Sequence, residues 1–154
     1  MLELRRLNAT VLEHSSEPSP FRTTEVLCVA RDGNEIAFCE PQWIDQKLRA
    51  ILEVASSLLR DATSANATAY AAALLWMGII AVHPFADGNG RTAFRFIVSR
   101  LDRSKHRIDA ADYPILRRYL IRGDVNNDLR NLTVIINSLI KRAGAQSCPT
   151  QSAA

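Results

Sequence analysis

One run of nine residues, from His83 to Arg91, carries the side chains best suited to chemistry. It reads His-Pro-Phe-Ala-Asp-Gly-Asn-Gly-Arg. His83 can take a proton from a hydroxyl near neutral pH, because the unperturbed pKa of an imidazole lies close to neutrality. Asp87 offers the hard carboxylate oxygens that Mg²⁺ prefers, and Arg91 offers a permanently charged planar fork that suits phosphate. The run therefore predicts a site for phosphate chemistry.

The position of the run between two predicted helices strengthens this interpretation. An almost wholly apolar stretch, residues 67–82, precedes it, and residues 91–101 after it read as another helix. The first-turn N–H groups of that helix lack intrahelical partners and bind anions readily. Gly88 and Gly90 let the backbone approach a phosphate, and Asn89 can either bond phosphate oxygens or hold the turn.

Each of these residues also has a purely structural interpretation. A lone His after an apolar helix is more often structural than catalytic, and Asp-Gly-Asn-Gly by itself is an ordinary turn signal. Phe85 has no polar chemistry and reads as a core anchor. The joint arrangement of a base, a carboxylate, glycines and Arg at a helix start favours the functional interpretation.

The run resembles the signature of the Fic (filamentation induced by cyclic AMP) family, His-x-Phe-x-Asp/Glu-Gly-Asn-Gly-Arg-x-x-Arg, and the resemblance extends from about residue 21 to about residue 140. It implies a mainly α fold, a compact Fic-type helical bundle with a small β-hairpin flap. It also implies transfer of AMP from ATP to a Ser, Thr or Tyr hydroxyl of a target protein. In that reaction His83 would be the catalytic base and Asp87 would hold Mg²⁺. Gly88, Asn89, Gly90 and Arg91 would bind the phosphates.

One position departs from the signature. The second Arg of the family falls at Phe94 here, and Arg95 follows one residue later, about 100° further round the helix. We expect Arg95, a long side chain, to be a further phosphate contact and Phe94 to be a core residue. Thr92-Ala93 followed by a bulky apolar residue is similar to the Doc (death on curing) branch, which transfers phosphate to a protein hydroxyl. Doc-type motifs usually carry Lys or another residue in place of Gly90, so three functions stay open: nucleotide transfer, phosphotransfer and a catalytically silent Fic-fold binding protein.

A hairpin signal precedes the run in the chain. Residues 26–31 and 34–38 flank Asp32-Gly33, a pair typical of a tight two-residue turn. By the resemblance this hairpin is the flap, which aligns the target by strand addition. Its target-docking residues would be Cys28, Val29, Ala30, Ile36, Ala37 and Phe38. The alternative is a hairpin with a structural role alone.

Helical patterns cover most of the remaining chain. We expect helices over residues 2–12, 43–60, 67–82, 91–101, 112 to 120 or 121, and from 124 onward, where a stripe is formed by Val125, Leu129, Leu132, Ile136 and Leu139. The 154 residues fit one domain of ordinary composition, 47% hydrophobic and 23% charged. We divide the chain into an N-terminal segment (1–20), a Fic-like domain (21–142) and a disordered tail (143–154).

Composition also bears on partners and location. The apolar stretch 67–82 is shorter than the ~20 residues that a bilayer needs, and no signal peptide is visible. We therefore expect a cytoplasmic protein without a membrane partner, while the sequence leaves delivery into another cell open. The three cysteines, Cys28, Cys39 and Cys148, lack metal spacing and are expected to be reduced.

The net charge is +3, and its densest basic cluster contains Arg100, Arg103, Lys105, His106 and Arg107. Such a cluster attracts a nucleotide, an acidic partner or nucleic acid, or it simply complements a helix C-terminus. Because no aromatic residues interleave it, a nucleic-acid partner is not favoured.

Restraint of the activity is the last question that the sequence raises. Many Fic proteins carry an inhibitory helix with Ser/Thr-x-x-x-Glu-Gly/Asn. None of the seven Glu residues here is followed by Gly or Asn, and none has Ser or Thr four places before it. A toxin-like enzyme would then need a separate antitoxin, unless the missing second Arg makes such restraint unnecessary.

Overall fold

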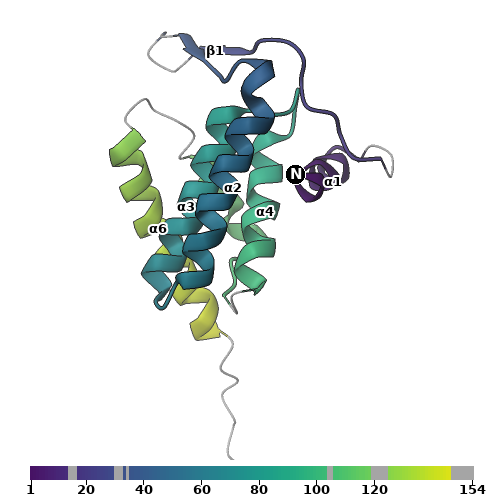
Figure 1. Ribbon diagram of the computed structural model, residues 1–154. Coiled ribbons are helices and arrows are strands. Elements are labelled where there is room, and N and C mark those ends of the chain that lie inside the picture. Colours follow the sequence, from purple (N-terminus) through teal and green to yellow (C-terminus); the bar gives the residue numbers. More distant parts are fainter. Residues whose placement is uncertain (14–16, 30–32, 34, 104–105, 119–124, 147–154) are drawn as a thin grey trace, which may run out of the picture.

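The computed structural model describes residues 1–13, 17–29, 33, 35–103, 106–118 and 125–146, and for Val29, Ile36, 125–127 and 141–146 it describes the backbone alone. The chain is mainly α, as predicted, with one two-stranded hairpin (Figure 1). Its elements in chain order are α1 (Leu2–Val11), β1 (Leu27–Val29), β2 (Glu35–Ala37), the 3-10 turn Pro41–Trp43, α2 (Ile44–Asp61), α3 (Ala65–Val82), α4 (Asn89–Arg103), the 3-10 turn Ala110–Asp112, α5 (Tyr113–Arg117) and α6 (Val125–Gln146).

Helix α3 is the centre of the bundle. It packs against α2, α4 and α6, and Figure 1 shows these helices gathered around it. Its start is fixed by Ser64, whose Oγ accepts a hydrogen bond from the amide of Ala67 at 3.2 Å. Of the helices in the described residues, α3 alone has the length and apolarity of a membrane span, and 61% of it is buried inside the bundle. A helix that is apolar on every side belongs in a core, so the prediction of a central core helix is confirmed.

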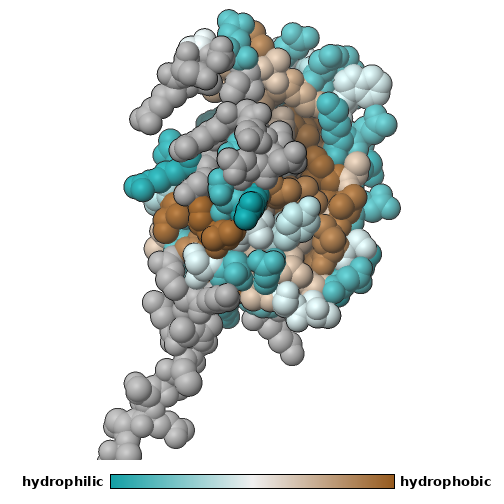
Figure 2. All heavy atoms as spheres, turned by 90° about the vertical axis from the view of Figure 1, so that its left-hand side faces the viewer, coloured by the Kyte–Doolittle hydropathy of each residue, from teal (hydrophilic) through white to brown (hydrophobic). Residues whose placement is uncertain are grey.

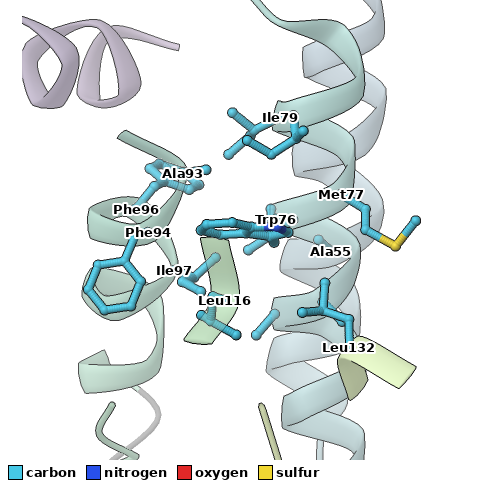
Figure 3. Packing of buried hydrophobic residues seen from close by; sticks show 14 of the residues in the cluster. Ala55, Trp76, Met77, Ile79, Ala93, Phe94, Phe96, Ile97, Leu116 and Leu132 are labelled. Atoms are coloured by element: carbon cyan, nitrogen blue, oxygen red, sulfur yellow. The ribbon is translucent and has the colours of Figure 1, made fainter. Parts of the chain in front are cut away.

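The core fixes the distance between α3 and its neighbours. Trp76 lies between α3 and α4, facing Phe96 and Ile97, with Leu116 of α5 beneath them (Figure 3). On the other side, Gly78 lets α2 approach closely, since a Cβ there would lie 2.6 Å from Cγ2 of Ile51. These contacts hold the end of α3, and with it His83, in a defined place.

The hairpin lies at the end of the bundle where α3 ends (Figure 1). Its strands are antiparallel, with Leu27 opposite Ala37 and Val29 opposite Glu35. Gly33 has a φ of +85°, as a tight turn requires. The predicted docking residue Ala30 lies outside the described residues. Cys28 is exposed and Cys39 is buried, and no disulfide joins them.

Most helix bounds agree with the sequence patterns to within two residues. Three members of the predicted stripe on α6, Leu132, Ile136 and Leu139, are buried in the core. The predicted tail starts at 143, whereas α6 continues to Gln146; residues 147–154, with Cys148, lie outside the described residues. Some hydrophobic side chains stay exposed, among them Val134 on α6. Figure 2, which shows the side of the molecule that is on the left in Figure 1, has brown hydrophobic areas between hydrophilic ones.

Candidate active site

His83 stands at the C-terminal end of α3 in an unusual backbone conformation. Its φ and ψ are 49° and 59°, the left-handed region that glycine normally occupies at this position. The amide of His83 donates to the Ile79 carbonyl at 3.0 Å, which closes the last turn of the helix. Strained conformations of this kind cluster at functional sites, since the surrounding structure must hold them in place.

The environment of the His83 imidazole favours its neutral form. Burial lowers its pKa below the ordinary value of 6.5, and the positive charge of Arg22 lowers it further. The Ile80 backbone, whose effect is second only to that of burial, and the Asp87 carboxylate act in the opposite direction. The ring Nδ1 is buried and makes no hydrogen bond of ordinary geometry, so Nε2 is the nitrogen left to face the cleft that His83 lines. A neutral ring with Nε2 free can act as a general base.

The hairpin, the predicted flap, contributes an aromatic ring to the same place. Phe38, directly after β2, stacks on the His83 imidazole with ring centroids 4.1 Å apart and ring planes 24° apart. Its amide donates to the Val26 carbonyl at 3.3 Å, which continues the pairing of the hairpin by one bond. The orientation of His83 therefore depends on the hairpin as well as on α3.

The loop between His83 and α4 is held by Asn89. The Asn89 Oδ1 accepts from the Phe85 amide at 2.9 Å, and its Nδ2 donates to the Phe85 carbonyl at 2.8 Å. Both residues are buried. Of the two roles that the sequence allowed for the Asn89 side chain, the structure shows the one that holds the turn. Any phosphate contact of this residue would come from its backbone.

Helix α1 fits against the other side of the loop. Asn8 donates from Nδ2 to the Asp87 carbonyl at 2.9 Å and to the Thr92 hydroxyl at 3.0 Å. Gly88 has a φ of +76°, and a Cβ there would lie 3.0 Å from Asn8 Nδ2 and 3.2 Å from Val11 Cγ1. Any other residue here would be strained by the positive φ, and its Cβ would press on the side chains of Asn8 and Val11.

The N-terminus of α4 is open toward the cleft. Within the described residues, the amides of Asn89, Gly90 and Arg91 have no acceptor, whereas the Gly88 amide is bonded to Asp87 Oδ1 at 2.5 Å. Arg91 lies over this turn, with one guanidinium nitrogen 3.7 Å from Asp87 Oδ2 and another bonded to the Val11 carbonyl at 3.2 Å. Three free amides at a helix start form an anion site.

These groups share one cleft of about 610 Å³, within the usual range for ligand sites. It is lined by Cys28, Phe38, Ile80, His83, Ala86, Asp87, Gly88, Asn89, Gly90, Arg91, Tyr113 and Arg117. The structure thus brings His83 together with the phosphate turn, residues 88–91, which we predicted to bind phosphate. It also adds Cys28 and Phe38 of the predicted docking flap. Ala37 lines a neighbouring groove on the far side of Phe38 instead.

Arg95 does not line this cleft. It is exposed and lines an adjoining pocket, between α1 and α4, together with Glu13, Phe94 and Asp102, and the two pockets share Arg91 and Tyr113. Phe94 is buried, and its ring packs edge-on against Tyr113 with centroids 5.4 Å apart, so the prediction of a core role is confirmed. The place of the second motif Arg is therefore apolar.

Sequence reasoning missed Arg117 and Tyr113, which line the cleft from α5. The two are four residues apart, so both lie on one face of the helix. Tyr113 approaches the phosphate turn closely, since a Cβ on Gly90 would lie 3.1 Å from its hydroxyl. The only sequence signal was a pair of residues with helical spacing in the helix expected from residue 112, which does not reveal where that helix packs.

Asp87 is the carboxylate in this cleft that could hold Mg²⁺. Its carboxylate is 77% exposed and lines the cleft beside the free amides. The described residues contain no group of three or more His, Cys, Asp or Glu that could hold a metal by itself. A single carboxylate suits Mg²⁺, which usually binds through one or two carboxylates together with substrate phosphates.

Comparison with known proteins agrees with this fold. The model of the Fic/DOC family matches residues 2–101, and the chain belongs to this family. The match begins ahead of residue 21, where we placed the start of the Fic-like domain, and it includes α1. No curated protein matches the chain.

A solved structure shares the fold. It is that of a Fic-domain-containing signaling protein from Bacteroides thetaiotaomicron VPI-5482, with a TM-score of 0.68 and 18% sequence identity. The similarity covers 93% of this chain and 60% of that chain, so this chain spans less than two thirds of that protein's length.

Proposed function

We propose that this protein is an adenylyltransferase that moves AMP from ATP to a Ser, Thr or Tyr hydroxyl of a target protein. Membership of the Fic/DOC family, which is generally linked to AMP transfer or related transfers, supports the reaction class. The observation that carries the proposal is the sharing of one cleft by a neutral His83, Asp87 and the open N-terminus of α4. This combination provides a base and an anion site within reach of one ligand.

The reaction follows from these groups. The target hydroxyl loses its proton to His83 Nε2 while its oxygen bonds to the α-phosphorus. The bond from that phosphorus to the oxygen bridging to the β-phosphate breaks, and pyrophosphate leaves. The amides of Asn89, Gly90 and Arg91 stabilise the charge on the phosphate oxygens, and they cost no reorganisation because α4 already fixes them. Positioning and charge neutralisation thus account for the rate enhancement.

Asp87 would hold Mg²⁺ against the phosphates in this reaction. The ion, when bound, neutralises phosphate charge. The contact of Asp87 with Arg91 is long, 3.7 Å, and both side chains are at least half exposed. The carboxylate is therefore available to a metal at little cost.

Phosphotransfer to the same hydroxyl is a second candidate. It is favoured by Phe94, because a buried aromatic ring provides no charge for a terminal phosphate at the place of the second motif Arg. A nucleotide bound in the opposite direction would present its γ-phosphate to the hydroxyl. A catalytically silent binding protein is the remaining alternative.

The cellular role that we propose is that of a cytoplasmic toxin-like enzyme restrained by an antitoxin in trans. The absence of the Ser/Thr-x-x-x-Glu-Gly/Asn pattern supports restraint by a separate protein. Growth that is unaffected by expression of the active chain alone would contradict this role, whereas a small protein co-purifying from the native locus would support it.

Intact-protein mass spectrometry tests the reaction. The chain, alone and with a cell lysate, is incubated with Mg²⁺ and ATP, and His83→Ala serves as the control. A gain of one AMP mass that requires His83 supports adenylyl transfer, and a gain of one phosphate mass supports the second candidate. No gain with any nucleoside triphosphate would contradict both.

A further inference from the structure

Arg22 is a buried cation that the proposed reaction does not use. Only 6% of its surface is exposed, although it precedes the hairpin in a segment without helix or strand. Among the described residues no carboxylate lies within ion-pair distance of it. A buried charge without an ion pair is costly unless its donors are all bonded, so a particular arrangement must keep Arg22 inside.

Backbone carbonyls supply that arrangement. The Arg22 Nε donates to the His83 carbonyl at 2.7 Å, and one terminal nitrogen donates to the Thr24 carbonyl at 2.6 Å. The other terminal nitrogen donates to the Cys39 carbonyl and, at 3.3 Å, to the Val82 carbonyl. The planar fork of one guanidinium thus bonds four carbonyls from three parts of the chain.

Two of these carbonyls belong to the end of α3. The last carbonyls of a helix lack intrahelical partners and carry partial negative charge, so a cation there is stabilised. The other two carbonyls, of Thr24 and Cys39, lie just before and just after the hairpin. The main chain is tied to the same place, because the Arg22 amide donates to the Pro84 carbonyl at 2.9 Å.

These hydrogen bonds therefore join the two ends of the hairpin to the backbone of His83, the proposed catalytic base. Phe38, one residue before Cys39, is the side chain that stacks on the His83 imidazole. We propose that Arg22 is the positioning residue of this site: its guanidinium fixes the flap on the end of α3, so that the Phe38 ring holds the His83 imidazole in place. This inference rests on the proposed role of His83, but its geometric consequences do not depend on turnover.

Charge and geometry are separable effects of Arg22. The charged groups that act on the His83 imidazole are Arg22 and Asp87, and Arg22 favours the neutral ring. Lysine keeps the charge but cannot bond four carbonyls with one planar fork, whereas glutamine loses both the charge and the fork. The variants Arg22→Lys and Arg22→Gln therefore distinguish the two effects, with Arg49→Lys on the exposed face of α2 as the matched control.

The experiment is NMR of the full chain without nucleotide. In Arg22→Lys we expect loss of the Phe38–His83 ring-current shift, at least tenfold faster exchange of the Phe38 amide, and a rise in the pKa of His83 because its ring is less buried. In Arg22→Gln the same losses should come with a larger rise in the pKa of His83, because the positive charge of Arg22 is lost as well. An unchanged ring-current shift and amide exchange in both variants would overturn the inference.

The wild-type chain provides a measurement that does not depend on whether the variants fold. The Nε–H of Arg22 should exchange with solvent far more slowly than that of Arg49, because it is buried on the His83 carbonyl. Equal exchange rates of the two Nε–H groups would refute the hydrogen bonding of the Arg22 guanidinium described above. If the rings separate in the variants while the wild type transfers nothing, the proposed function fails and this inference stands; if transfer and stacking both survive, this inference fails.

Discussion

Replacement of Asn89 by alanine tests whether this side chain holds the loop or binds the nucleotide. The two hydrogen bonds between its amide and the Phe85 backbone, 2.9 and 2.8 Å long, are buried. Alanine leaves the Phe85 N–H and C=O without partners. Each buried group left unpaired costs about 1–3 kcal/mol, so we expect Asn89→Ala to lower the free energy of unfolding by about 2–6 kcal/mol.

Thermal and urea unfolding of the purified variants measure this change. For a chain of this size, 1 kcal/mol shifts Tm by about 2–4 °C, so the loss corresponds to a fall in Tm of about 4–24 °C. Asn89→Asp is a second variant, because it keeps the acceptor for the Phe85 amide but sets a buried carboxylate oxygen against the Phe85 carbonyl. We expect it to lose at least as much stability as Asn89→Ala.

One result would refute this reasoning. If the free energy of unfolding of Asn89→Ala lies within about 0.5 kcal/mol of the wild-type value while nucleotide affinity is lost, the Asn89 side chain binds the nucleotide, as the family resemblance implied. A large loss of stability, with affinity per folded molecule reduced only through disorder of the loop, supports the geometry described above.

Three further outcomes follow from the site. Because the pKa of His83 lies below its ordinary value of 6.5, the folded chain binds fewer protons at this residue than the unfolded chain does. The free energy of unfolding should therefore fall as the pH drops through 6.5. Urea titrations at different pH values measure this fall, and His83→Gln should reduce it. Because Arg117 lines the cleft and Arg95 does not, Arg117→Ala should weaken Mg-ATP binding about fivefold and Arg95→Ala less than twofold, as measured by calorimetry. A larger loss of affinity in Arg95→Ala than in Arg117→Ala would place Arg95 at the phosphates. Gly88→Ala should lower the Tm more than Gly33→Ala does. Both glycines have a positive φ, but only a Cβ at position 88 would press against side chains of α1. Equal losses of Tm would contradict this close packing.

Local patterns in the sequence determined the elements and the motif. The apolar stretch at 67–82 could only be buried, and the turn signal at Asp87 to Gly90 could only separate two helices. The residues of the phosphate turn lie within a few positions of one another, so their meeting at one helix start required no tertiary information. Phe94 could be assigned to the core for the same reason, since its neighbours on the helix are apolar.

The tertiary structure decided how the motif is held and which further side chains reach it. Asn8 bonds the Asp87 carbonyl across 79 positions of sequence, and Arg22 bonds the His83 carbonyl across 61. Neither partner is encoded in a local pattern, because each contact depends on how α1 and the hairpin fold back onto the bundle. The same packing turns Arg95 away from the cleft and brings Arg117 into it. Helix periodicity specifies which residues share a face, and only the packing of the helices specifies what that face meets.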